Sequence, residues 1–303
     1  ESISPKPQIQ WIQTSCIGCG ICVDTCPEKA LTQTSESITI NRAVCTGCGV
    51  CTEECPTTAM ELLGKKWSVP DLAREVVKDR VFFEQSSGGV TLSGGEAALQ
   101  KDFCLGLLKE LRGRGIQTAL DTCGQVPQSI LAELLPYVDI LLYDIKEIDS
   151  KKHKTFTGAG NEKILANAVF AAHFKKTHPY PKTLWIRTPI IPGTTDRADN
   201  MQGIGDFIRT NLAGVVDRWE LCAYNNLCRD KYARLGMAWP FANKELPERS
   251  FMEELTRIAQ SFVPQTSVCW SGSTKLKQST NTRLPDKNKG TGIHLIPLLR
   301  DEC

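Results

Sequence analysis

The 303-residue chain has no long apolar run, little net charge and few histidines. No stretch approaches the roughly 20 consecutive apolar residues of a membrane-spanning helix, so we expect no membrane association. The formal net charge of +2 is too close to zero to indicate a nucleic-acid-binding protein. No N-terminal secretory signal is visible. The four histidines have no metal-ligand spacing; they are His153, His173, His178 and His294. These absences favour a soluble globular protein whose chemistry depends on other side chains.

Cysteine is abundant by comparison. Eight of the 14 cysteines fall in two runs of the pattern C-x2-C-x2-C-x3-C-P, offset by 29 residues. The runs are Cys16, Cys19, Cys22, Cys26, Pro27 and Cys45, Cys48, Cys51, Cys55, Pro56. The other six cysteines are scattered, unlike those of a secreted disulfide framework. Thiolates held for metal fit a reducing compartment, so the sequence predicts a cytoplasmic protein.

The two runs are typical of a bacterial-type ferredoxin module with two 4Fe-4S clusters, in which the fourth cysteine of each run ligates the other cluster. The predicted ligand sets are Cys16, Cys19, Cys22 and Cys55 for one cluster, and Cys45, Cys48, Cys51 and Cys26 for the other. A pair of zinc ribbons is the alternative. Zinc sites usually take paired C-x2-C segments, which makes this alternative the weaker one.

Four regions follow from the pattern along the chain: a lead-in over residues 1–11, the ferredoxin module over 12–64, a strand–helix alternation over 65–270, and a polar, disordered tail over 271–303. In the third region, apolar runs predict strands at 89–92, 116–120, 138–145, 184–191, 219–224 and 267–270. Helices are predicted between them, beginning with one capped by Ser68. Such alternation predicts a parallel sheet or barrel.

Three polar motifs follow successive predicted strands: Ser93-Gly94-Gly95-Glu96, Asp121-Thr122-Cys123-Gly124 and Asp144-Ile145-Lys146. In a β/α barrel, ligands bind at that end of the strands. Glu96 could accept hydrogen bonds from an ammonium group, Asp121 from ribose hydroxyls, and Lys146 could pair with a carboxylate. S-adenosylmethionine carries all three groups. Each motif alone is also typical of an ordinary turn, and an acid such as Glu96 often stabilises a helix N-terminus. Arg187 has two interpretations, a ligand contact or a structural ion pair.

From about residue 41 to 261, the chain resembles the glycyl-radical-enzyme activating proteins of the radical SAM superfamily, relatives of pyruvate formate-lyase activating enzyme. The resemblance is carried by the two Cys runs and by residues 88–96 (GGVTLSGGE), 120–124 (LDTCG), 143–146 (YDIK) and 187–193 (RTPIIPG). It implies an α/β fold, namely a partial (β/α)6 radical SAM-type barrel lacking its first strand, with an inserted two-cluster ferredoxin module.

The resemblance also implies roles for individual residues. Gly94, Gly95 and Glu96 would hold the methionine amino end, and Asp121 and Lys146 would contact ribose and carboxylate. Asp121, Thr122 and Asp144 match positions that surround a monovalent cation in a relative, and Ile145 belongs to the same cofactor-binding segment. Asn225 falls where that relative has a histidine near the cofactor.

One feature of the family does not occur in this sequence: the C-x3-C-x2-C loop that holds the catalytic cluster. The cysteines outside the two runs are too scattered to replace it; they are Cys104, Cys123, Cys222, Cys228, Cys269 and Cys303. We therefore expect that residue 1 lies just beyond that loop, and that the chain alone is inactive.

The resemblance implies the activity of the intact protein. It would bind a third, catalytic 4Fe-4S cluster, cleave S-adenosylmethionine reductively, and generate a glycyl radical on a partner enzyme. A flavodoxin- or ferredoxin-type protein would supply electrons. Two alternatives remain open. One is a ferredoxin-type electron carrier fused to a partner-docking barrel, without S-adenosylmethionine chemistry, and the other is a flavin-linked barrel reductase.

Overall fold

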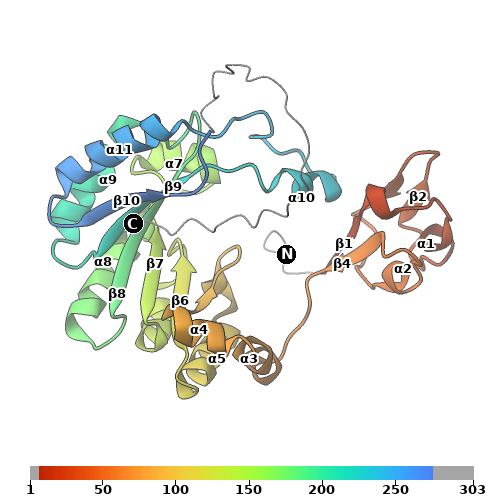
Figure 1. Ribbon diagram of the computed structural model, residues 1–303, viewed down its shortest axis with the longest axis horizontal. Helices are drawn as coiled ribbons and strands as arrows, with labels where there is room; N and C mark the ends of the chain where they lie inside the picture. Colours follow the sequence, from red (N-terminus) through yellow and green to blue (C-terminus); the bar gives the residue numbers. More distant parts are fainter. Residues whose placement is uncertain (1–6, 276–303) are drawn as a thin grey trace, which may run out of the picture.

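The computed structural model describes residues 7–275, which form two parts joined by a short linker. A small module with the Cys runs stands beside a larger α/β domain (Figure 1). No helix among residues 7–275 is long and apolar enough to cross a membrane.

The small module consists of two antiparallel strand pairs and two one-turn helices. Strand β1 (Gln8–Trp11) pairs with β4 (Met60–Leu63), and β2 (Leu31–Gln33) pairs with β3 (Ile38–Ile40). The helices α1 (Ile21–Asp24) and α2 (Val50–Glu53) carry one cysteine each into the core, and a 3-10 turn, η1 (Gln13–Ser15), follows β1. The core residues are Ile9, Cys22, Leu31, Ile38, Cys51 and Met60.

The predicted lead-in over residues 1–11 is wrong for its last part. Gln8–Trp11 is a strand of the module, because Ile9 is 1% exposed in the module core and the backbone of β1 pairs with β4. Residues 1–6 lie outside the described part of the chain.

The larger domain is built on six parallel strands in the order β10-β9-β8-β7-β6-β5. They are β5 (Gly89–Leu92), β6 (Gln117–Thr122), β7 (Ile140–Asp144), β8 (Thr183–Ile190), β9 (Arg218–Ala223) and β10 (Ser267–Ser271). Each strand lies beside its neighbour in the sequence, which is the usual arrangement of consecutive β-α-β units. The predicted α/β fold with a parallel sheet is confirmed.

Helices cover one face of this sheet. The helices of the larger domain are α3 (Val69–Val77), α4 (Arg80–Ser86), α5 (Lys101–Gly113), α6 (Gln128–Leu134), α7 (Ser150–Thr157), α8 (Glu162–Thr177), α9 (Ala198–Asn211), α10 (Arg229–Arg234) and α11 (Arg249–Phe262), with 3-10 turns η2 (Ala97–Gln100) and η3 (Leu135–Tyr137). Those that contribute buried residues to the core are α3, α5, α6, α8, α9 and α11. Along β8, Leu184, Ile186 and Ile190 belong to the buried core with helix residues, whereas Trp185 and Arg187 are only half-buried. The sheet therefore keeps a second, more polar and more open face.

The six predicted strands are confirmed, and each end lies within two residues of its predicted position. The predicted helix cap at Ser68 is also confirmed, because the Ser68 hydroxyl accepts a hydrogen bond from the Asp71 amide at 3.2 Å. Three short helices, α4, α7 and α10, were not predicted. The predicted tail starts too early, because Ser271 ends β10 and Lys275 pairs with Glu245 at 2.7 Å and Glu248 at 3.0 Å. For residues 276–303, the predicted disordered tail lies outside the described residues.

Arg42 joins the module to the larger domain. Its Nε donates to the Leu235 carbonyl at 2.8 Å, just after α10, and its Nη1 donates to the Ile9 carbonyl at 2.9 Å. Helix α10 accordingly lies near β1 and β4 in Figure 1. One side chain thus connects a β1 carbonyl with a loop more than 190 residues away in the sequence.

Candidate cluster and cofactor sites

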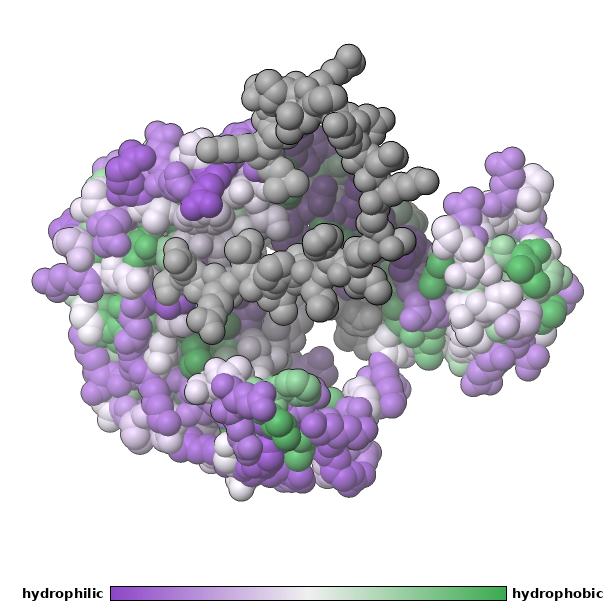
Figure 2. Space-filling model, in the orientation of Figure 1, coloured by the Kyte–Doolittle hydropathy of each residue, from purple (hydrophilic) through white to green (hydrophobic). Residues whose placement is uncertain are grey.

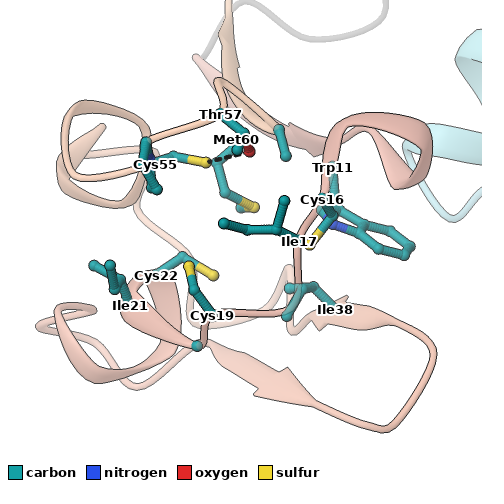
Figure 3. A pocket seen from close by; sticks show the side chains of 13 residues that line it. Trp11, Cys16, Ile17, Cys19, Ile21, Cys22, Ile38, Cys55, Thr57 and Met60 are labelled. Atoms are coloured by element: carbon teal, nitrogen blue, oxygen red, sulfur yellow. Dashed lines mark hydrogen bonds between the residues drawn. The ribbon is translucent and has the colours of Figure 1, made fainter.

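The first candidate site is a hollow in the module, lined by Cys16, Cys19, Cys22 and Cys55. Most of the other lining groups are apolar; those labelled in Figure 3 are Trp11, Ile17, Ile21, Ile38, Thr57 and Met60. The four sulfurs come from the loop before α1, from α1 itself, and from the end of the second run. The structure thus brings together the four cysteines of the first predicted set.

The second candidate site is a hollow lined by Cys26, Cys45, Cys48 and Cys51. It gathers the second predicted set, including the cysteine that precedes Pro27. That these eight side chains ligate two clusters stays a prediction.

Glycines allow the chain to turn sharply between the ligands. Gly20 and Gly49 are the N-cap residues of α1 and α2, with φ of 78° and 89°, a region that side chains rarely adopt. A Cβ on Gly20 would also lie 2.9 Å from Gln33 Oε1. The glycines therefore set the loop path that places Cys22 and Cys51.

Burial and repulsion between neighbouring sulfurs disfavour the deprotonated form of these cysteines unless a cation is present. Burial raises the pKa of the Cys22 thiol, and neighbouring Cys55, Cys16 and Cys19 raise it further. Burial and the same kind of neighbours raise the pKa of Cys51 to about 11. Because cluster binding requires deprotonated thiols, loading the sites is expected to release protons.

The arrangement of the sulfurs around each hollow favours a metal cluster over a single metal ion. In residues 7–275, no group of three or more His, Cys, Asp or Glu side chains is close enough to hold one metal ion. The sulfurs instead surround a volume, as Figure 3 shows for the first hollow. Thiolates are soft ligands that suit iron and sulfide. The residues present therefore fit a cubane.

The third candidate site lies at the carboxyl ends of the parallel strands, where Glu96 ties two loops together. Its carboxylate accepts hydrogen bonds from Thr122 Oγ1 at 2.7 Å and from the amides of Cys123 at 2.9 Å and Ala98 at 3.2 Å. Glu96 thus caps the N-terminus of η2, which was one of its two interpretations, and also fixes the loop after β6; its contact with a ligand ammonium stays a prediction. Gly94 and Gly95 precede it and are exposed.

Asp121 lies at the centre of a charged network on the open face of the sheet. Its Oδ2 accepts from Ser93 Oγ at 3.0 Å and from Arg187 Nη1 at 3.1 Å. Arg187 reaches on to Glu220, with Nε 3.2 Å from Oε2. Although burial alone would lower the pKa of Arg187, the charges of Cys222, Asp121 and Asp144 raise it, so the guanidinium stays protonated. Arg187 forms the structural ion pairs that were one of its two interpretations.

Asp144 and Lys146 form a second, looser pair at the end of β7. Lys146 Nζ lies 3.6 Å from Asp144 Oδ2, and the lysine side chain is 38% exposed. Burial raises the pKa of Asp144 to about 6, although Lys146 lowers it. The Lys146 ammonium is therefore close to this network and still accessible to an anionic group.

The remaining predicted residues take different places. Thr122 and Ile145 are buried, and the Ile145 amide donates to the Arg187 carbonyl at 2.9 Å, so the two support the strand ends. Asn225 is exposed after β9, and its Oδ1 accepts from the Leu227 amide at 3.2 Å. The structure thus joins Asp121 to Ser93 and Glu96 to Thr122, while Asn225 caps its own turn.

Two members of the network were missed from the sequence, Glu220 and Cys222. On β9, burial alternates residue by residue, and Arg218, Glu220 and Cys222 share the less buried face. The signal was therefore present as polar residues at every second position of a strand. Arg218 also stacks over Trp185, 4.1 Å from its ring centre, which extends the polar face across β8 and β9.

The module matches a known family. Residues 15–59 fit the model of the 4Fe-4S dicluster domain. This match favours iron–sulfur clusters over the zinc alternative.

Curated proteins are similar to the chain over most of its length. It is 34% identical over 278 residues to the (2S)-3-sulfopropanediol dehydratase activating enzyme of Klebsiella oxytoca, covering 90% of this chain and 86% of that protein. It is 36% identical over 267 residues to the (2S)-3-sulfopropanediol sulfolyase activating enzyme of Bilophila wadsworthia, covering 86% and 85%. The chain belongs to the family of glycyl-radical-enzyme activating enzymes.

A solved structure supports the fold. A radical SAM methyltransferase from Sphaerobacter thermophilus superposes with a TM-score of 0.52 and 14% identity, over 80% of this chain and 69% of that one. The larger domain therefore has the radical SAM fold, as the resemblance implied.

Proposed function

We propose that this chain provides the S-adenosylmethionine-binding face and the accessory iron–sulfur module of an activating enzyme for a glycyl radical enzyme. The observation that carries the proposal is the convergence of charged side chains from four successive strands, β6 to β9, on one open face. Asp121, Asp144, Lys146, Arg187 and Glu220 meet there. They offer groups of both signs, which a zwitterionic ligand with a ribose requires.

The residues of this face would bind and orient the ligand. Asp121 is held by Ser93 and Arg187, so its carboxylate is ready to accept from ribose hydroxyls without reorganisation. The accessible Lys146 ammonium would pair with the methionine carboxylate. Gly94 and Gly95 leave backbone groups uncovered for the amino end, while Glu96 fixes their loop. A monovalent cation beside Asp121, Thr122 and Asp144 would offset the two carboxylates.

A catalytic 4Fe-4S cluster, when bound and reduced, supplies the electron that splits S-adenosylmethionine into methionine and a hydrogen-abstracting 5′-deoxyadenosyl group. Such a cluster needs three thiolates that leave one iron open. Outside the module, the cysteines described are Cys104, Cys123, Cys222, Cys228 and Cys269, and they form no such group. The ligands of the catalytic cluster are therefore not among residues 7–275, and we expect no cleavage by those residues alone.

The module would hold two further clusters in the sets gathered around its two hollows. We propose that they relay electrons from a flavodoxin- or ferredoxin-type donor in the cytoplasm. The partner would be a glycyl radical enzyme, because the relatives activate enzymes of that kind.

The test is the binding of S-adenosylmethionine to the anaerobically reconstituted chain, measured by equilibrium dialysis. Asp121→Asn and Lys146→Ala should each weaken binding about 10- to 100-fold, because each removes a charge-assisted contact of roughly 1.5–3 kcal/mol. Lys152→Ala is the matched control, since Lys152 pairs with Asp199 on the surface. Equal binding by all four proteins contradicts the proposal. Absence of specific binding by the wild-type chain would favour the electron-carrier alternative.

A further inference from the structure

The two hollows of the module are copies of one another. A shift of 29 residues maps most of the lining of the first onto the second, with the fourth cysteine exchanged between them. The matched pairs are Cys16 and Cys45, Cys19 and Cys48, Cys22 and Cys51, Cys55 and Cys26, Pro56 and Pro27, Ala59 and Ala30, Met60 and Leu31, and Ile38 and Ile9. Because the frames are so alike, the few unmatched positions show where the two sites differ.

Trp11 is the largest of these differences. Its indole lines the first hollow, whereas the position 29 residues later is Ile40, which is not part of the second lining. The Trp11 backbone pairs with Met60 in β1–β4. An apolar side chain would serve for packing at such a position, as Ile40 does in the other half.

The Trp11 indole nitrogen is buried and has no hydrogen-bond partner among the described residues. A buried N–H without an acceptor loses its hydrogen bonds to water and gains none in return, so native proteins rarely leave one unpaired. In Figure 3, the edge of the indole that carries this nitrogen is turned toward the Cys16 side chain. The acceptor that is missing therefore lies in the direction of the hollow.

We propose that the Trp11 indole N–H donates a hydrogen bond to a sulfur of the cluster held by Cys16, Cys19, Cys22 and Cys55, and thereby raises the reduction potential of that cluster alone. The inference rests on the proposed two-cluster function of the module. A donor at a cluster sulfur stabilises the added electron, which is one of the means by which proteins set such potentials.

A second difference between the two hollows should also raise the reduction potential of the first cluster. Thr57 Oγ1 lies 3.8 Å from Cys55 Sγ, and the matching position in the second hollow is Glu28. In contrast, the positive charge of Arg42 acts near Cys45, at the second hollow. The proposal therefore concerns the change in one potential when Trp11 is altered, and not the order of the two potentials.

The test is an EPR-monitored redox titration of the anaerobically reconstituted 303-residue chain, wild type against Trp11→Phe. One of the two midpoints should become more negative by about 59 mV, which corresponds to a tenfold change in a one-electron reduction equilibrium. The other should stay unchanged, and so should both in Trp67→Phe, because Trp67 lies outside both linings. Two unchanged midpoints, or two equal shifts, in a Trp11→Phe protein with wild-type iron content would overturn the proposal.

A measurement on the wild-type protein keeps the proposal testable if Trp11→Phe loses its clusters. With ¹⁵N at the indole nitrogens, pulsed EPR of the reduced protein should show coupling of one cluster to one nitrogen. Absence of that coupling, with two intact clusters present, overturns the role of Trp11 only. Absence of two 4Fe-4S clusters in the wild-type protein would instead overturn the proposed function.

Discussion

The module and the α/β domain reach their folds by different means. The module has a core of six buried residues, two of which are cysteines assigned to clusters. The α/β domain has a large continuous core that joins five central strands to the helices on one face, including the fully buried Leu120, Leu141, Leu184 and Trp219. We therefore predict that apolar burial is sufficient for the α/β domain, whereas the module depends on its metal. Hydrophobic side chains remain on the surface of both parts: Figure 2 shows green atoms on each, and Ile17 of the module is 67% exposed.

Removal of iron should have the largest effect, because it should destabilise the module and leave the α/β domain folded. Segments of about 60 residues bury too little surface to be robust alone, and cluster binding supplies folding free energy. We expect limited proteolysis of the apo-protein to cut within residues 12–59 and to spare residues 101–263. The holo-protein, digested in parallel, is the control. Equal protection of the module with and without iron would show that its apolar core suffices.

Gly124→Ala should destabilise the α/β domain by about 3 kcal/mol and leave the clusters intact. Gly124 has φ of +70°, and an added Cβ would lie 1.8 Å from Tyr143 Oη, which donates to the Ile164 carbonyl. Thermal unfolding followed by far-UV circular dichroism measures the loss.

The control for this change is Gly158→Ala. Gly158 has a similar φ of +87° and nothing within 4 Å of the added Cβ, so it reports the backbone cost alone, about 1–2 kcal/mol. Equal losses at the two positions would contradict the predicted clash with Tyr143.

Asp144 should make the stability of the α/β domain depend on pH. Burial raises its folded pKa from 3.8 to about 6, so the folded state keeps a proton that the unfolded state releases between these values. Stability should therefore fall as pH rises from about 4 to 6. Asp144→Asn should lack this component. Urea titrations of both proteins across this range measure the difference, and parallel curves for the two proteins would rule the effect out.

Arg42→Ala should have the smallest effect, a loss of about 1 kcal/mol in the free energy of unfolding, and should uncouple the module from the α/β domain. The change removes hydrogen bonds to the Ile9 and Leu235 carbonyls. Hydrogen exchange should accelerate near α10 and stay unchanged in β6–β8. Arg74→Ala, which breaks only an exposed pair with Asp71, is the control. Unchanged exchange at α10 would mean that Arg42 does not couple the two parts.

The sequence predicted most of the fold because its signals were local. The cysteine spacing marked the module, and apolar runs marked the six strands. In the larger domain, the three missed helices have only six to eight residues each, which is too short for an apolar stripe to repeat over several turns. Helix α7 did carry a local signal, since Asp149 caps it by accepting from the amides of Lys151 and Lys152.

The charged network was harder to predict because its partners are distant in the sequence. Arg187 pairs with Asp121, 66 residues away, and with Glu220, 33 residues away. Only the register of β6 to β9 brings these three side chains together. The strand-end motifs predicted where the candidate site lies, whereas its ion pairs became visible only in the folded sheet.

The exchange of the fourth cysteine between the two hollows bears on how the two halves of the module depend on each other. A single 29-residue unit contributes three cysteines to one hollow and its last to the other, so one unit cannot surround either hollow with four. A chain with one unit would have to pair with an identical copy to surround a cluster with four cysteines. In a chain that joins two such units, each half can change separately, and Trp11 and Ile40 are one such difference.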